Sequence, residues 1–373
     1  MSYQSKRTYS VAVSDYYLDY EDYCDRTRSF GFFSEKGDSY TITDKNTPRP
    51  WINMLYNDRF AAEITNIGFG HTVYGTFYNK VTRYHDSELY LLRHPNARRV
   101  LELQDHETGH RFNLFDCDNL ACTVMPGCSA FSGEENGIKF VVKVFVPRED
   151  ACENWLIELT DVSEKERKLT LSAQQTWSFH VYLGGIGTKE PSKNTITEFK
   201  GNGIYAVADD IGRPFYTMYG GFAIDHCTAH HVVEDCEKTL ITAKRMPAEY
   251  GDFHYTVATV SSDVTLQPHG TGKRVVVSAA STDEKEVLDT TKKYECVETA
   301  ETELEKVLTY WEEQCSYNTC SIPDKNLERF LNIWLKYQLG LTYRYNRHTH
   351  NGGYRDVLQD SWGTMMISPE YGK

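Results

Sequence analysis

The stretch Asn351-Gly-Gly-Tyr-Arg-Asp-Val-Leu-Gln-Asp-Ser-Trp-Gly-Thr-Met-Met366 decides how the rest of this 373-residue chain is interpreted. Two glycines interrupt the chain, and the residues from Tyr354 onward have helical spacing. Apolar residues recur on one side at intervals of three and four, namely Leu358, Trp362, Met365 and Met366. The opposite side carries Asp356, Asp360 and Thr364, with Gln359 near its edge. A helix that packs its apolar side inward and shows two carboxylates can line a pocket for a hydroxyl-rich ligand such as a sugar. Spacing alone favours an ordinary solvated face.

Upstream, the chain alternates short apolar or β-branched runs with turn signals from about residue 29 to 280. The runs predict strands near 40–43, 68–78, 138–146, 155–161, 169–176, 204–208, 255–261 and 274–279. The turn signals between them are Glu35–Asp38, Glu134–Gly137, Lys200–Gly203 and Gln267–Gly272. Many short strands at this spacing predict two packed antiparallel sheets instead of βαβ units. Gly184-Gly-Ile-Gly187 lacks the full nucleotide-binding fingerprint, so nucleotide binding is not predicted.

Helical patterns replace the strands from residue 281. Ser281-Thr-Asp-Glu-Lys-Glu286 predicts a helix start with carboxylates in its first turn. A stripe over about five turns then predicts a connecting helix that rests one face on a neighbour, formed by Val297, Ala300, Leu304, Val307, Leu308, Trp311 and Cys315. Asp324 is a suitable cap for another helix. Its broad apolar face predicts burial among other helices, and is formed by Leu327, Phe330, Leu331, Trp334, Tyr337, Gln338 and Leu341.

Composition excludes several classes of function. The formal net charge of −13 disfavours nucleic acid and anionic membranes as partners. No apolar run approaches the roughly 20 residues that span a bilayer, and no secretory signal follows Met1, so we expect a cytoplasmic protein. The ten cysteines are scattered and are expected to be reduced, and neither their spacing nor that of the histidines predicts a metal site.

Several motifs in this order resemble the family 94 glycoside hydrolases, which are inverting glycoside phosphorylases. The segment Gly353-Tyr-Arg-Asp-Val-Leu-Gln-Asp360 is similar to their Gly-Tyr-Arg-Asp-x-x-Gln-Asp motif. The other similar segments are Gly31–Glu35, Tyr40–Thr43, Thr47–Asn53, Phe145–Trp155, Trp311–Cys315 and Leu331–Gln338. The resemblance implies a large antiparallel β-sandwich of the galactose-mutarotase-like supersandwich type. A helical linker and the first helices of an incomplete (α/α)6 barrel follow it.

On this basis we predict four segments. Residues 1–28 form an N-terminal extension without a counterpart in the family, and residues 29–280 form the β-sandwich domain. Residues 281–322 form the helical linker, and residues 323–373 form the start of the catalytic barrel.

The resemblance also assigns roles to individual residues. In the family, the arginine and aspartate of the Gly-Tyr-Arg-Asp motif hold hydroxyls of the sugar to be cleaved, which implies this role for Arg355 and Asp356. Gln359 and Asp360 match the motif and are expected to support that pair. Arg347 is the expected equivalent of an upstream arginine, although the loop around it departs from the family pattern. The expected partners are a β-linked oligosaccharide and inorganic phosphate as co-substrate, with no other cofactor, and the resemblance implies a homodimer for the full-length protein.

One part of the family's machinery has no match. The general acid is an aspartate in a Trp-x-Asp segment that lies further along the barrel. None of the six tryptophans here is followed two residues later by aspartate. We therefore expect the general acid beyond Lys373 and expect this chain alone to be inactive.

Two alternatives stay open at the level of sequence. The aromatic content of 13% and the missing acid also suit a non-catalytic β-sandwich that binds oligosaccharide or mediates assembly. A module of a cyclic β-1,2-glucan synthase shares the phosphorylase-like motifs, but the chain contains no predicted membrane span.

Overall fold

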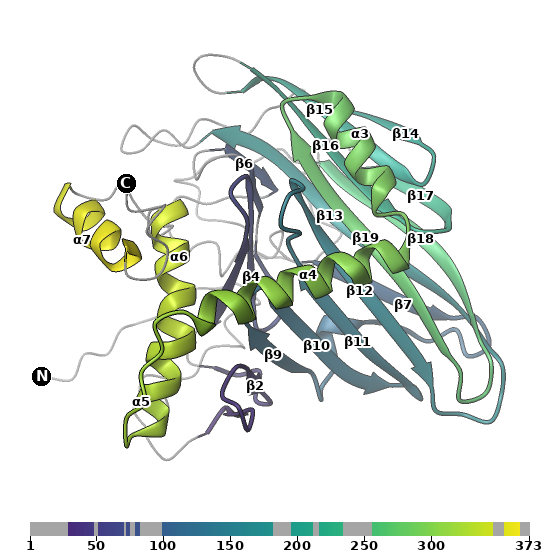
Figure 1. The fold of residues 1–373 in the computed structure, drawn as a ribbon. Coiled ribbons are helices and arrows are strands. Elements are labelled where there is room, and N and C mark those ends of the chain that lie inside the picture. The colour runs from purple at the N-terminus through teal and green to yellow at the C-terminus, as the bar shows by residue number, and fades with distance from the viewer. Residues whose placement is uncertain are drawn as a thin grey trace, which may run out of the picture.

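Two antiparallel β-sheets pack face to face, and a group of helices follows them (Figure 1). Helices α3 (Glu284–Lys293) and α4 (Val297–Ser316) lie against the ten-stranded sheet, and α6 (Leu335–Tyr345) is in contact with β3 (Ile52–Tyr56) of the other. The computed structural model describes residues 29–47, 51–70, 72–74, 79–82, 99–181, 195–211, 216–233, 256–345 and 354–365. Residues 1–28, the predicted extension, therefore lie outside the described part. The predicted fold class, a large β-sandwich followed by a few helices, is confirmed.

The first sheet has ten strands in the order β1-β2-β9-β10-β11-β12-β19-β16-β15-β14. Its strands are β1 (Gly31–Phe33), β2 (Tyr40–Ile42), β9 (Ala121–Met125), β10 (Cys128–Glu135), β11 (Ile138–Phe145), β12 (Cys152–Asp161), β14 (Thr195–Lys200), β15 (Gly203–Ile211), β16 (Tyr216–Ile224) and β19 (Thr271–Ser281). Consecutive strands pair as hairpins at β9–β10–β11–β12 and at β14–β15–β16. Strand β19 joins these two groups.

The second sheet has nine strands, in the order β17-β18-β13-β6-β5-β4-β3, with β7 pairing with both β13 and β8. Its strands are β3 (Ile52–Tyr56), β4 (Phe60–Thr65), β5 (Thr72–Tyr74), β6 (Asn79–Thr82), β7 (Val100–Asp105), β8 (Arg111–Asn113), β13 (Arg167–Val181), β17 (Cys227–Val233) and β18 (Thr256–Leu266). A 3-10 turn, η3 (Leu114–Asp116), follows β8.

The β10–β11 hairpin shows why these residues form strands. Along β11, Phe140 and Val142 are buried between the sheets, whereas Lys139 and Lys143 are exposed. This alternation matches the two-residue period of a strand that buries one face. The loop residues Asn136 and Gly137 have φ angles of 50° and 72°, the left-handed conformation that a tight hairpin turn requires at both positions. The predicted turn at 134–137 is confirmed.

Two hydrophobic cores result from this arrangement. Between the sheets, Trp155 of the first sheet and Trp177 of the second both pack edge-on against Phe222, with ring centroids 5.8 and 6.5 Å apart. The second core lies on the outer face of the ten-stranded sheet, where Val287 and Leu304 cover strands such as β19. Helices α3 and α4 therefore cover part of this outer face.

The helices follow the last strand in chain order. They are α3 (Glu284–Lys293), α4 (Val297–Ser316), α5 (Lys325–Arg329), the π-helical turn η5 (Phe330–Trp334), α6 (Leu335–Tyr345) and α7 (Tyr354–Met365). Asp283 caps α3 by accepting from the Lys285 N–H. Asp324, the predicted cap, accepts from the backbone N–H groups of Asn326 and Leu327. Both predicted helix starts are confirmed.

Helix α4 lies along the sandwich as the predicted connecting helix (Figure 1). Ala300, Leu304, Val307 and Trp311 are buried, as the stripe predicts. Leu308 was assigned to the same stripe but is 38% exposed, because it follows the buried Val307 by one residue and points about 100° away from it on a helix.

The buried face predicted for residues 327–341 is only partly correct. Tyr337 and Leu341 are buried, but Leu327 and Phe330 are 46% and 48% exposed. The π-helical turn at Phe330–Trp334 changes the helical phase between these two groups. The sequence prediction assumes an uninterrupted helix. It therefore placed these four residues on one buried face, whereas only two of them are buried.

Tyr337 ties the helices to the sandwich. Its hydroxyl donates to Asn53 Oδ1 at 3.1 Å and contacts the Met54 carbonyl oxygen, and Tyr56 donates back to the Tyr337 carbonyl at 3.0 Å. Trp311 of α4 packs edge-on against both tyrosine rings, with centroids 4.7 and 5.5 Å apart. These contacts fix α6 against strand β3 and helix α4 together.

Candidate functional site

Helix α7 carries the predicted site residues and lies beside α6. Figure 1 shows it at the edge of the molecule opposite α3. A methyl group placed on Gly363 would lie 2.9 Å from Leu339 Cδ2. The glycine therefore allows the two helices to approach closely, and a larger residue there would separate them.

The orientation of α7 differs from the sequence prediction. Leu358, Trp362 and Met365, the side expected to pack inward, are 59%, 71% and 44% exposed. Thr364, expected on the solvent side, is 3% exposed. The expected inward packing of Leu358, Trp362 and Met365 is therefore wrong, because helical spacing cannot say where the neighbouring elements lie.

The structure describes the predicted binding residues to different extents. Arg355, Asp356 and Asp360 belong to the backbone of α7, but their side chains lie outside the described part. Gln359 is exposed on the same helix. Arg347 lies in segment 346–353, outside the described residues. The assignment of sugar-binding roles to these five residues therefore stays a prediction.

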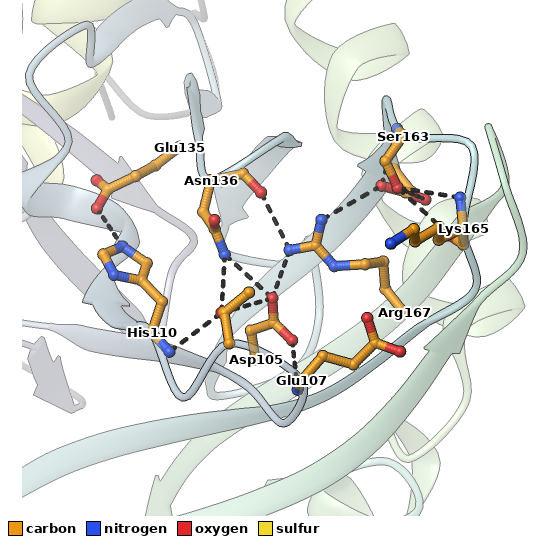
Figure 2. A network of polar contacts seen from close by, with 10 residues as sticks. Asp105, Glu107, His110, Glu135, Asn136, Ser163, Lys165 and Arg167 are labelled. Carbon is orange, nitrogen blue, oxygen red and sulfur yellow. Dashed lines mark hydrogen bonds and ion pairs between the residues drawn. The ribbon is translucent and has the colours of Figure 1, made fainter.

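A network of polar side chains joins three turns of the sandwich (Figure 2). Arg167 Nη2 lies 2.5 Å from Asp105 Oδ2 and donates to the Asn136 carbonyl at 3.0 Å. Asn136 Nδ2 donates to the same carboxylate at 3.1 Å, and Arg167 Nη1 lies 3.9 Å from Asp161 Oδ1. Asp105 ends β7, Asn136 is in the β10–β11 turn, and Asp161 ends β12, so the network links both sheets.

The Asp105 carboxylate of this network is paired with Arg167 and neighbouring donors, although Arg167 Nε is buried without a hydrogen-bond partner among the described residues. Burial acts to raise the pKa of Asp105, but hydrogen bonds from the Glu107 N–H, the Thr108 hydroxyl and Arg167 outweigh it and hold that pKa below its ordinary value. A buried carboxylate that is ionised and fully hydrogen-bonded has no capacity left for a substrate. The network is a structural clamp, and it lies at turns remote from α7 (Figure 1).

A second buried ion pair was not foreseen from sequence. Arg99 and Glu153 meet between the two sheets through two hydrogen bonds of 2.8 and 2.6 Å, and Arg99 also donates to the Phe69 carbonyl. The Trp155 indole donates to Glu153 at 2.5 Å. The available signal was Glu153, which has the same two-residue phase as the apolar Trp155 and Ile157 along a strand-like run. A glutamate that a strand buries needs a partner.

In the part of the chain that the structure describes, no arrangement of side chains indicates metal binding or a reactive thiol. There, no group of three or more histidine, cysteine or acidic side chains is close enough to hold a metal ion. Its cysteines are free thiols. Burial raises the pKa of Cys122, Cys128 and Cys152, which keeps these thiols protonated and unreactive. Within the same residues, no helix combines the length and apolar character needed to cross a membrane.

Comparison with known families gives two matches in chain order. Residues 38–198 match the supersandwich domain of glycosyl hydrolase 94, and residues 310–373 match the catalytic domain of the glycosyl hydrolase 94 superfamily. The first range covers most of the sandwich. The second begins near the end of α4 and includes α5 to α7.

Characterised relatives align along almost the whole chain. A 3-O-beta-D-glucopyranosyl-beta-D-glucuronide phosphorylase of Paenibacillus borealis is 25% identical over 92% of this chain and 45% of its own length. An N,N'-diacetylchitobiose phosphorylase of Vibrio furnissii is 22% identical over 91% of this chain and 45% of its own length. The chain thus spans a little under half the length of these relatives.

Solved structures share less sequence identity with this chain than these relatives do. A galactose mutarotase related enzyme from Lactobacillus acidophilus aligns with 63% of this chain and 99% of its own chain, at a TM-score of 0.37 and 7% identity. A bacterial glucoamylase complexed with acarbose aligns with 86% of this chain and 41% of its own chain, at a TM-score of 0.39 and 9% identity. At such TM-scores these likenesses add nothing to the family matches.

Proposed function

Because the chain belongs to glycoside hydrolase family 94, we propose that it is the N-terminal part of an inverting β-glycoside phosphorylase. The observation that supports this most is the order of the two family matches on one chain, sandwich first and catalytic segment second. The reaction proposed is the reversible phosphorolysis of a β-linked disaccharide or oligosaccharide to a sugar 1-phosphate. The phosphorylase relatives named above support this reaction class without fixing the sugar or the linkage.

The chemistry explains why one carboxylate can suffice. An inverting hydrolase uses one carboxylic acid to protonate the leaving oxygen and one carboxylate to activate water. Phosphate is already an anion, so no base is needed to activate it, and cationic groups hold it in place of the second carboxylate. Arginine suits that task because its planar fork binds phosphate oxygens in pairs.

Arg355 and Asp356 are proposed to hold the sugar that is cleaved. A carboxylate accepts hydrogen bonds from two neighbouring hydroxyls, and an adjacent guanidinium keeps it ionised and oriented. Both residues lie in the first turn of α7, whose packing against α6 gives the pair a rigid base. Gln359, Asp360 and Arg347 are proposed as supporting groups.

The general acid is proposed to lie beyond Lys373, so that these 373 residues alone do not turn over substrate. The exposed apolar side chains of α5 and α7 support this, since further barrel helices would cover them. Inorganic phosphate is the proposed co-substrate, and the longer enzyme is proposed to act in the cytoplasm as a homodimer.

The test is a pair of substitutions in a longer protein that contains this chain and the rest of the barrel. Arg355→Ala and Asp356→Asn are each expected to lower phosphorolysis by about 100-fold or more, because they remove charged contacts that orient the reacting sugar. Sugar 1-phosphate released from a panel of β-linked disaccharides is the readout. Full activity in either variant would remove the assignment.

Matched substitutions on the sandwich control for unspecific effects. Arg111→Ala and Asp118→Asn change exposed residues of the same types and are expected to leave both activity and unfolding nearly unchanged. If the longer protein releases no sugar 1-phosphate but hydrolyses or binds the same sugars, the chain belongs to a hydrolase or a binding protein and the proposed reaction is wrong.

A further inference from the structure

A groove of about 310 Å³ lies on the outer face of the ten-stranded sheet, far from α7. The edge strand β14 and its neighbours β15 and β16 form its floor and one wall, and the start of α3 forms the other wall (Figure 1). Along β15 the side chains alternate between the two faces. Ala206 points to the core between the sheets, whereas Tyr205 packs on the helix-covered side. The volume is at the lower end of the roughly 300–1,000 Å³ of small-ligand sites.

Tyr205 provides a flat surface in this groove. It pairs across the strands with Gly221 and shares a strand face with Gly203. A methyl group on Gly221 would lie 3.3 Å from Tyr205 Cε1, and one on Gly203 would lie 3.5 Å from Cε2. Both edges of the ring thus lie close to glycines that carry no side chain, and the Tyr205 hydroxyl forms a hydrogen bond with Thr291 of α3. The ring lines the groove beside α3.

Polar groups line the same groove as this ring. Glu198 and Lys200 of β14 form an ion pair of 2.9 Å, and Glu284 stands at the first position of α3. All three side chains line the groove. Two carboxylates beside an aromatic platform offer strong acceptors for hydroxyl donors and disfavour an anionic ligand. Apolar contact comes from Ile196, Val207, Tyr219, Val287 and Leu288.

The wall formed by β14 is braced from its other face. Phe199, which points opposite to Glu198 and Lys200 on this strand, stacks on His230 of β17 with ring centroids 3.6 Å apart and an interplanar angle of 7°. The contact joins the free edge of one sheet to the free edge of the other. The groove therefore does not depend on a ligand for its shape.

We propose that this groove binds one sugar unit of a neutral oligosaccharide, with the apolar ring face on Tyr205 and hydroxyls on Glu198 and Glu284. A pyranose has a flat C–H face and a rim of hydroxyls, which matches a tyrosine face bordered by carboxylates. A peptide strand added to β14 is disfavoured, because charged residues such as Glu198 and Lys200 protect an edge strand from pairing. The site is separate from the proposed cleavage site on α7 and does not depend on it.

Saturation-transfer NMR on the purified 373-residue chain tests the proposal, since it detects weak binding. The probes are cellopentaose, the pentasaccharide of N-acetylglucosamine, and trigalacturonate as an anionic comparison. We expect at least one neutral probe to bind, with the strongest saturation on the C–H protons of one ring face. Trigalacturonate is expected not to bind.

Substitutions then locate the binding. Tyr205→Ala and Glu198→Ala are each expected to weaken binding by about tenfold, because stacking and a charge-assisted hydrogen bond each contribute that much or more. Glu198 is largely exposed, so its variant keeps the fold even if Tyr205→Ala does not. Glu312→Ala on α4, also exposed, is expected to bind like the unchanged chain.

Three outcomes would overturn the proposal. The first is the absence of binding by both neutral probes to the folded chain. The second is binding that Glu198→Ala leaves unchanged while Arg355→Ala abolishes it, which would place the sugar on α7 only. The third is a dimer in sedimentation that Glu198→Ala or Tyr205→Ala dissociates, which would make the groove a contact between two copies of the chain. Failure of phosphorolysis in the longer protein affects none of these results.

Discussion

Tyr337 is the residue on which the attachment of the helices to the sandwich depends. It is buried, its ring touches Tyr56 and Trp311, and its hydroxyl reaches Asn53 and the Met54 carbonyl. Burial raises its pKa, so the hydroxyl stays a donor at any ordinary pH. A single hydroxyl thus contacts two acceptors of strand β3 while its ring packs against helix α4.

Tyr337→Phe is expected to lower the free energy of unfolding by about 1–3 kcal/mol, because it leaves buried acceptors without their donor while keeping the ring. Urea denaturation followed by tryptophan fluorescence measures the loss. Tyr317→Phe, at a position that is 55% exposed, is the matched control and should change the free energy by less than about 0.5 kcal/mol. Equal effects in the two variants would mean that the hydroxyl does not hold the interface.

The pair formed by Arg99 and Glu153 gives a second prediction for single residues. Glu153→Gln leaves a buried guanidinium without its counter-charge and is expected to cost about 3–5 kcal/mol of unfolding free energy. The double variant Arg99→Met with Glu153→Leu is expected to cost less than the sum of the single changes, since no charge stays buried. Chemical denaturation of the unchanged chain, Arg99→Met, Glu153→Leu and the double variant provides the measurement for this cycle, and Glu153→Gln is measured beside them.

An exposed ion pair serves as the comparison for that cycle. Lys285 and Asp289 lie 2.7 Å apart on α3, with both side chains mostly in solvent. Asp289→Asn should change the unfolding free energy by less than about 0.5 kcal/mol. If Glu153→Gln is as mild as Asp289→Asn, solvent reaches the buried pair and the two sheets are less tightly closed there than the contacts indicate.

Among the structural elements, the three turns held by Arg167 have a stability that depends on pH. The pKa of Asp105 is lowered in the folded protein, so its ionised form stabilises the fold above its unfolded pKa of about 4. That contribution is lost as the pH falls through the folded pKa, when the carboxylate must take up a proton. The free energy of unfolding is therefore expected to fall on acidification below about pH 4.

Asp105→Asn tests this dependence. The variant is expected to be less stable than the unchanged chain at pH 7, and its stability should decline less steeply below about pH 4. Thermal unfolding between roughly pH 3 and pH 7 is the measurement. Asp118→Asn, at an exposed position, should reproduce the slope of the unchanged chain. Identical slopes for all three proteins would remove Asp105 as the cause.

Strands and their turns are the elements that the sequence predicts best. In β11 the alternation of buried Phe140 and Val142 with exposed lysines is local, and Asn136–Gly137 needs only its own backbone to make the turn. The π-helical turn at Phe330–Trp334 was not foreseen, because periodicity assumes a regular helix and the turn adjoins contacts with a distant part of the chain. Arg329 donates to the Glu35 carbonyl and Trp334 to the Gly37 carbonyl, both in the β1–β2 hairpin about 300 residues away in the chain.

The candidate site was less predictable for a related reason. Spacing identified the apolar and polar sides of α7, but the exposure of Trp362 and the burial of Thr364 depend on where α6 lies. Spacing also gave no reason to connect Tyr205 with Gly203 and Gly221, which meet only once β15 and β16 pair. Motifs locate residues along the chain, whereas enclosure depends on tertiary packing.

At the scale of the whole molecule, the sandwich and the helices differ in how completely they are covered. The sandwich has a dense core between its sheets and a second one beneath α3 and α4. By contrast, α5 and α7 expose large apolar side chains, with Trp362 at 71% and Leu358 at 59%. A stable soluble surface rarely leaves such residues together, and the chain spans 45% of its phosphorylase relatives.

The 373-residue chain on its own is therefore expected to bind a hydrophobic dye and to self-associate through α5 and α7. Combining Leu358→Glu with Trp362→Glu should reduce both dye fluorescence and the associated fraction in sedimentation, because two charges replace two exposed apolar groups. Leu308→Glu, at a partly exposed apolar position on α4, should not. In a longer protein that includes further barrel helices, the same double change should instead lower the melting temperature, since those helices would bury both positions. A chain that neither binds dye nor associates, or a longer protein that tolerates both charges, would show that these faces are solvent-exposed in the complete enzyme.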